Sequence, residues 1–151
     1  GRDDNPKLTR LGTQEWTNVK TKTYKATEKL ASELISLYAS RKVQEGYSFQ
    51  SDSPWQSSLE SSFPFQETND QITTINEVKA DMELLSPMDR LVCGDVGYGK
   101  TEVALRASFK SVNSGKQVAI LVPTTVLAQQ HFETFINRLQ PFPVNIDVLS
   151  R

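Results

Sequence analysis

Cysteine and histidine are nearly absent from this 151-residue sequence, which holds one of each, Cys93 and His131. A disulfide framework needs paired cysteines, and a structural zinc site needs several Cys or His ligands, so both classes of protein are excluded. The sequence also lacks the run of about eighteen apolar residues that a membrane-spanning helix requires. Its first residues have no apolar stretch of the kind found in signal peptides. We therefore expect a cytoplasmic protein without a membrane segment.

The sequence also has no large excess of positive or negative charge, because it contains 17 Lys and Arg residues and 18 Asp and Glu residues. The charge is uneven along the chain, with a net +3 over residues 1–50, −7 over residues 51–89 and +3 over residues 90–151. A uniformly basic nucleic-acid binder is excluded, so any contact with DNA must be local. The shifts in charge indicate a composite chain.

Glycine and proline are absent between Thr13 and Glu45, where apolar or amphipathic side chains recur every three or four residues. These side chains are Trp16, Val19, Thr23, Ala26, Leu30, Leu34, Leu37 and Tyr38. The spacing predicts one amphipathic helix over residues 13–45, with Thr13 as N-cap and Gly46 as the residue just past its end. At 1.5 Å per residue it would be roughly 50 Å long. Such a helix either packs along its own domain or serves as a lever or partner-binding element.

The remainder of the chain predicts alternating helices and strands. Residues 48–62 contain seven serines and are predicted as a loop, with a short helix starting at Ser53-Pro54. Further helices are predicted at residues 68–84, 100–114 and 125–139, and short apolar runs predict strands at residues 90–93, 117–122 and 144–149. Apolar strands that alternate with helices are typical of a parallel sheet. The predicted fold class is α/β, with a long N-terminal helix followed by an incomplete parallel sheet that has three predicted strands and flanking helices.

A phosphate-loop pattern lies between the first predicted strand and the next helix. It consists of Gly94, Asp95, Val96, Gly97, Tyr98, Gly99, Lys100 and Thr101, which fit G-x-x-x-x-G-K-[ST] without exception. Its glycines allow backbone N–H groups to turn toward an anion, at a helix N-terminus whose dipole favours negative charge. Lys100 would reach the β- and γ-phosphates, and the Thr101 hydroxyl would bind Mg²⁺. The segment therefore predicts a nucleotide site with Lys100 and Thr101 as its catalytic residues.

Two neighbours of this pattern carry weaker expectations. Cys93 ends the predicted strand, and we expect it to be a small buried side chain. Tyr98 lies inside the loop, so it either faces solvent or lies beside the nucleotide. The sequence leaves these two positions of Tyr98 open.

Three segments extend the pattern beyond the loop: residues 65–71 (FQETNDQ), residues 88–104 (MDRLVCGDVGYGKTEVA) and residues 122–131 (VPTTVLAQQH). They closely resemble the translocase module of the bacterial transcription-repair coupling factors, the Mfd family. The resemblance also covers Leu11-Gly12 with Trp16, the Leu-Tyr-Ala of residues 37–39 and Phe63-Pro64, so it extends over nearly the whole chain. RecG helicase has a similar phosphate loop and Pro-Thr-x-x-Leu-Ala segment, but not the long preceding helix.

The resemblance implies a fold, ligands and partners. This region would join an RNA-polymerase-interacting domain to the first RecA-like lobe of a superfamily 2 double-stranded DNA translocase, which binds ATP and Mg²⁺. Double-stranded DNA, RNA polymerase and repair proteins such as UvrA are the implied partners. The implied organisation is the end of an upstream module at 1–12, a connecting helix at 13–46, a serine-rich loop at 47–64, and the N-terminal part of the ATP-binding lobe at 65–151.

The resemblance also implies residue roles outside the loop. Phe65 and Gln71 look like a Q-type motif, in which the aromatic ring lies near adenine and the amide reads its edge. Asn69 stands where many relatives have proline. Thr124 and Thr125 look like motif Ia, which holds DNA phosphates. For Gln71 and for the two threonines, an ordinary helix-capping role remains the alternative.

Some parts of a translocase are not recognisable in these 151 residues. No Asp-Glu-x-His box, arginine finger or second RecA-like lobe is found, and we expect these beyond Arg151, together with the central strands of the sheet. The resemblance thus implies an ATP-dependent translocase as the full-length protein, and we expect no steady-state ATP turnover from the 151 residues alone. A RecG-like branched-DNA helicase and a non-catalytic adaptor that works through its long helix are the alternatives.

Overall fold

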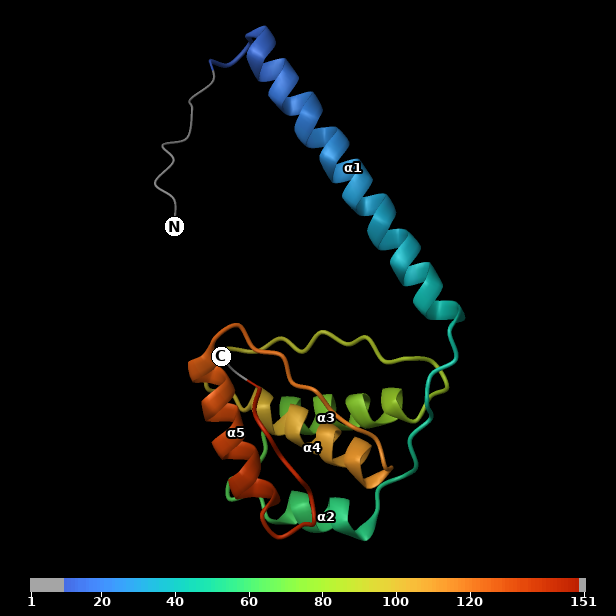
Figure 1. The fold of residues 1–151 in the computed structure, drawn as a ribbon, viewed down its shortest axis with the longest axis vertical. Coiled ribbons are helices and arrows are strands. Elements are labelled where there is room, and N and C mark those ends of the chain that lie inside the picture. Colours follow the sequence, from blue (N-terminus) through green and yellow to red (C-terminus); the bar gives the residue numbers. More distant parts are fainter. Residues whose placement is uncertain (1–9, 150–151) are drawn as a thin grey trace. The chain divides into compact units, whose positions relative to one another are not determined.

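The structure is a computed structural model that describes residues 10–149, and this part of the chain contains five helices. They are α1 (Gln14–Val43), α2 (Pro54–Ser61), α3 (Asn69–Met82), α4 (Lys100–Asn113) and α5 (Thr125–Leu139) (Figure 1). The chain divides between Gln44 and Glu45 into two compact units, so α1 belongs to one unit and α2 to α5 to the other. Within the described residues, none of the helices combines the length and apolarity needed to cross a membrane.

Helix α1 confirms the long helix predicted from the sequence. Thr13 is its N-cap, and the Thr13 hydroxyl accepts a hydrogen bond from the Trp16 backbone N–H. None of its residues is buried. Its length favours the helix instead, because its 30 residues exceed the roughly 12–15 residues below which isolated helices are marginal in water. The helix ends at Val43, with Gln44 already extended, and the prediction that Gly46 lies just past its end is therefore wrong.

Gly46 has a different role, in the second unit. Its backbone N–H donates to the Leu85 carbonyl over 2.5 Å. A Cβ at this position would lie 2.8 Å from the Pro87 backbone nitrogen, closer than real Cβ atoms approach backbone. Two backbone segments can therefore meet here only because residue 46 has no side chain.

The four helices of the second unit confirm their predicted positions, because their end signals are local. Ser53 caps α2 with Pro54 in its first turn, Thr68 caps α3, and Thr124 caps α5. Helix α4 ends before Gly115, whose φ of +73° is the left-handed conformation that glycine adopts without strain. Each of these helix ends is thus marked by one local residue, either a capping side chain or a glycine that has none.

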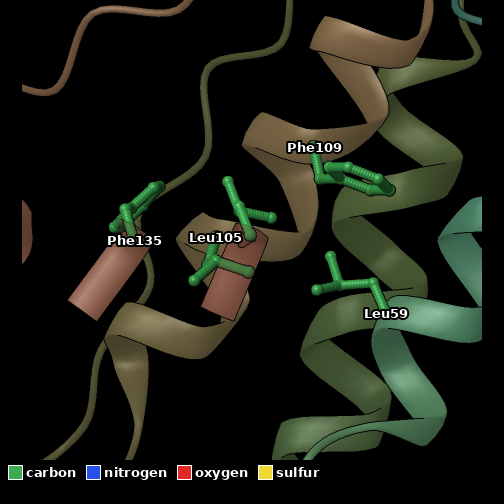
Figure 2. Packing of buried hydrophobic residues seen from close by; sticks show 5 residues of the cluster. Leu59, Leu105, Phe109 and Phe135 are labelled. Atoms are coloured by element: carbon green, nitrogen blue, oxygen red, sulfur yellow. The ribbon is translucent and has the colours of Figure 1, made fainter. Parts of the chain in front are cut away.

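Helix α4 lies at the centre of the second unit and contributes to two apolar clusters. Leu105 and Phe109 of α4 pack with Leu59 of α2 and with Phe135 and Leu139 of α5, and Figure 2 shows four of these side chains converging. On another side of α4, Val103 packs with Ile75, Val78 and Met82 of α3. The helix that begins at the phosphate loop is thus held from both sides.

A buried ion-pair group fastens the loop before α2 to α3 and α4. Lys110 is 3% exposed, and its Nζ donates to Asp52 over 2.9 Å and to Glu83 over 2.8 Å. Burial opposes the charged ammonium, but these two hydrogen bonds outweigh it and raise the pKa of Lys110 above its ordinary value. Lys79 of α3 also pairs with Asp52, which therefore joins both helices.

The predicted parallel sheet is wrong for this structure, because residues 10–149 contain no strand. A strand forms only where a neighbouring segment completes its hydrogen-bond ladder, and the apolar runs at 90–93, 117–122 and 144–149 do not pair with one another. Leu121 is 99% exposed as a result. In residues 142–149 every second residue is partly buried, so this run keeps the alternation of an extended chain while its side chains pack on helices. The alternation predicted for this run is therefore present, and the strand pairing is not.

Candidate nucleotide-binding site

The phosphate-loop segment forms a tight turn that leads directly into α4. Gly97 and Gly99 have φ values of +85° and +75°, in the left-handed region that other residues rarely adopt. Helix α4 begins at Lys100, immediately after the turn. The predicted loop-to-helix junction is therefore present, although the strand expected before it is not. Cys93 is exposed, so its predicted burial is wrong, because no sheet covers it.

The N-terminus of α4 is open, unlike the N-termini of the other described helices. Its N-cap is Gly99, which provides no side-chain hydrogen bond, whereas the other four helices are capped by Thr13, Ser53, Thr68 and Thr124. The first backbone N–H groups of a helix have no partner within the helix and attract anions. This N-terminus can therefore accept the oxygens of a phosphate.

Lys100 lies at the same junction, with its side chain folded back over the loop. The Lys100 Nζ donates to the carbonyls of Gly94 and Asp95, each over 2.6 Å. A Cβ at Gly94 would lie 3.6 Å from the Lys100 side chain, so the ammonium group is held close to the loop backbone. A positive charge beside open N–H groups suits an anionic ligand.

A metal ion at this site would depend on the ligand for most of its coordination. Within residues 10–149 no group of three His, Cys, Asp or Glu side chains is placed to hold a metal. Thr101 follows Lys100 in the first turn of α4 and can offer one hydroxyl oxygen. This arrangement fits Mg²⁺, which keeps several waters and shares substrate phosphates, better than a metal held by protein side chains alone.

Gln71 is the predicted site residue that the structure brings to the loop. Its Oε1 accepts a hydrogen bond from the Thr68 backbone N–H over 2.8 Å, and its backbone N–H donates to the Thr68 hydroxyl. Its Nε2 donates to the Tyr98 carbonyl over 2.9 Å, and a Cβ on Gly99 would collide with this amide. Gln71 is thus a helix cap, which confirms the capping alternative, and it also contacts the phosphate loop.

The two aromatic residues considered for the site from the sequence, Phe65 and Tyr98, are mostly exposed. Phe65 is 72% exposed and packs against Phe63 in an edge-to-face arrangement, with ring centroids 5.6 Å apart and an interplanar angle of 70°. Tyr98 is 64% exposed, and its carbonyl is engaged by Gln71. Both rings are available to a ligand. Contact of Phe65 with adenine stays a prediction.

The two threonines predicted to bind DNA lie at the start of α5. The Thr124 hydroxyl accepts a hydrogen bond from the Leu127 backbone N–H over 3.2 Å, so it caps the helix. Thr125 is the first residue of α5, and both side chains are exposed. The structure realises the capping alternative for Thr124, while a contact with DNA phosphates stays a prediction for both.

A network of charged residues beside the site was missed by sequence reasoning. Glu102, next to Thr101, accepts hydrogen bonds from Arg106 over 2.9 Å and from Arg138 over 2.8 Å. Arg106 also donates to Glu67 over 2.6 Å. Burial opposes the charged form of Arg106, but its hydrogen bonds to Glu67 and Glu102 outweigh burial and raise the pKa of Arg106. The hydrogen bond from Arg106 lowers the pKa of Glu67. Only the four-residue spacing of Glu102 and Arg106 could have indicated any of this from sequence.

Comparisons with known proteins agree on one family. Residues 68–150 match the DEAD/DEAH box helicase family. The chain is 59% identical over 146 residues to the transcription-repair-coupling factor of Mycobacterium tuberculosis and 57% identical over 146 residues to that of Bacillus subtilis. These matches cover 97% of this chain and 12% of each relative, so the chain spans about an eighth of their length.

Solved structures include one that is similar to this chain in both fold and sequence. It is RecG bound to a three-way DNA junction, which superposes with a TM-score of 0.67 at 33% identity. The superposition covers 72% of this chain and 15% of the RecG chain.

Proposed function

Because this chain belongs to the DEAD/DEAH box helicase family, we propose that it is the nucleotide-binding part of an ATP-driven double-stranded DNA translocase. The translocase would displace stalled RNA polymerase and couple transcription to nucleotide excision repair. The names of the relatives support this role. The observation that carries it is the open N-terminus of α4, with Lys100 beside it and Gln71 bonded to the loop.

In this proposal the loop residues bind the ATP phosphates. The backbone N–H groups from Gly97 to Thr101 would bind oxygens of the β- and γ-phosphates, and Lys100 would exchange its two carbonyl partners for phosphate. Mg²⁺ bound with ATP would neutralise phosphate charge, and the Thr101 hydroxyl would hold it. Because the left-handed glycines and the start of α4 are formed before binding, the backbone N–H groups need little reorganisation to stabilise the charge of the transferred phosphoryl group.

Gln71 would govern the choice of base. Gln71→Ala in the 151-residue chain is expected to lower the preference for ATP over GTP, because the adenine edge loses an amide that can donate and accept. An unpaired edge should cost roughly 1–3 kcal/mol of discrimination, or about 5- to 150-fold. Calorimetric titration with each nucleotide measures the ratio. Thr73→Ala, an exposed hydroxyl on the same helix, is the matched control, and an unchanged ATP-to-GTP ratio in Gln71→Ala would leave Gln71 as a helix cap only.

We extend the proposal to the partners of the longer relatives. Thr124 and Thr125, at the exposed start of α5, would contact the backbone of double-stranded DNA without reading bases. RNA polymerase and UvrA would be engaged through other parts of such a translocase, in the bacterial cytoplasm. Residues 1–12 would be the end of an upstream module, 13–46 a connecting helix, 47–64 a serine-rich loop and 65–151 the N-terminal part of the ATP-binding lobe.

The similarity to RecG makes a branched-DNA helicase the second candidate function. A coupling-factor chimaera, in which this sequence replaces the matching stretch of the Bacillus subtilis relative, separates the two. Under the proposal, the chimaera displaces a stalled RNA polymerase from DNA when ATP is supplied. A chimaera that unwinds three-way junctions but leaves polymerase in place would favour the RecG-like function instead.

A further inference from the structure

Phe63 lies against two arginine side chains that come from different helices. The Arg106 guanidinium of α4 lies over the Phe63 ring, 5.3 Å from its centroid, and the Arg138 guanidinium of α5 lies 5.5 Å from it. Both distances are within the range of cation–π attraction. The ring is therefore held by two fixed charges, in a segment that forms no helix or strand of its own.

The two arginines are themselves fixed by hydrogen bonds. Glu102 Oε1 accepts from both of them. Arg138 also donates to the Ser62 hydroxyl over 2.7 Å and to the Leu59 carbonyl over 3.2 Å, and Arg106 is only 4% exposed. The segment from Leu59 to Glu67 is thus attached to α4 and α5 on both sides of Phe63.

Phe65 receives its orientation from this attachment. It is largely exposed, and its ring forms an edge-to-face pair with the Phe63 ring, a geometry that aromatic pairs prefer. An exposed phenylalanine without such a contact would sample several rotamers and lose that freedom when it binds a ligand. The contact with Phe63 therefore places Phe65 before a ligand arrives.

We propose that Phe63 is a positioning residue that sets Phe65 against the base of a bound adenine nucleotide. This inference rests on the proposed function, and it adds a residue that acts on the base without touching it. Phe63 belongs to neither apolar core cluster of the second unit, so its replacement removes little of the packing that stabilises the fold. A contribution to base binding is therefore separable from a contribution to stability.

The test compares ATP with tripolyphosphate, which has the phosphates and lacks the base. Calorimetric titrations of the 151-residue chain with each compound, in the presence of Mg²⁺, give the ratio of the two affinities. Phe63→Leu is expected to lower ATP affinity about fivefold, the scale of the cost of immobilising one free side chain, and to leave tripolyphosphate affinity unchanged. Phe65→Leu should have the same effect, and the double variant should lose no more than either single variant.

Three further variants sharpen the result. Phe63→Tyr keeps the aromatic ring and should retain the wild-type ratio. Phe63→Met keeps apolar volume without the ring, so it should lose affinity as Phe63→Leu does, and it guards against a folding defect of one variant. Tyr24→Leu, an exposed ring on α1, is the matched control and should change neither affinity. Circular dichroism verifies the fold of each variant.

The outcomes separate this inference from the proposed function. If Phe65→Leu lowers the ATP-to-tripolyphosphate ratio and Phe63→Leu does not, the positioning role is overturned and the proposed function stands. If Phe63→Leu lowers both affinities equally, its effect is structural and the inference is overturned. If the wild-type chain binds neither compound, the proposed function fails, and the inference fails with it.

Discussion

Lys100→Ala is expected to lower ATP turnover of the coupling-factor chimaera by at least 10²–10³-fold, on the order of 3–4 kcal/mol of transition-state stabilisation. The Lys100 ammonium lies at the open N-terminus of α4, where the β- and γ-phosphates would bind. Charge on the transferred phosphoryl group is stabilised by such positioned cations, and alanine provides none. Phosphate release in steady state measures the rate.

The stability of the chain should barely change in this variant, because Lys100 is exposed and bonds only two loop carbonyls. Thermal unfolding followed by circular dichroism checks this. Lys116→Ala, three residues beyond Asn113 at the other end of the same helix, removes the same charge at a distance from the loop and should keep parental turnover. Parental turnover in Lys100→Ala would remove the phosphate loop from the mechanism.

The helices were predictable because their signals are short-range. Ser53-Pro54, Thr68 and Gly115 each act on the turn next to them, so no knowledge of the rest of the fold is needed. The phosphate loop is predictable for the same reason. Gly97 and Gly99 take left-handed conformations, which the pattern itself indicates because glycine adopts them without strain. The site could thus be located from about eight consecutive residues.

The prediction of a sheet was wrong because strand pairing is not a local property. An apolar run such as residues 117–122 indicates an extended conformation, but a ladder also needs a neighbour at the right register. The predicted burial of Cys93 was wrong for the same reason. Cys93 and Leu121 are exposed where a sheet would have covered them. The network around Glu102 was missed for a related reason, because Arg138 lies 36 residues away and its partner depends on how α5 packs on α4.

Capping and ligand binding use the same chemical groups, which explains why sequence alone left Gln71 and Thr124 open. The Gln71 side chain satisfies the Thr68 N–H and still reaches the loop carbonyl of Tyr98. Reading an adenine edge would require it to exchange at least one of these bonds. The cost of that exchange is small when a new hydrogen bond replaces the old one, so a residue can serve as a cap and still be recruited by the nucleotide.

Helix α1 gives the second large expected effect, through its continuity. It runs for 30 residues without a buried side chain and without glycine or proline. In the proposed organisation it connects a polymerase-binding part to the ATP-binding lobe. A rigid helix transmits a displacement only while its backbone hydrogen bonds are unbroken, and an interior proline removes one bond, bends the axis and costs about 3 kcal/mol.

Ser32→Pro, in the interior of α1, should therefore abolish displacement of stalled polymerase by the coupling-factor chimaera. The ATP affinity of the chimaera should stay within about twofold of the parental value, because the nucleotide site belongs to the other unit. Release of a stalled polymerase from immobilised DNA measures the first, and calorimetric titration the second. Gln14→Pro is the matched control, because residue 14 is the first of the helix, where proline is tolerated, and it should displace polymerase normally. If Ser32→Pro stays folded and displaces polymerase at the parental rate, α1 is a packing element and transmits nothing.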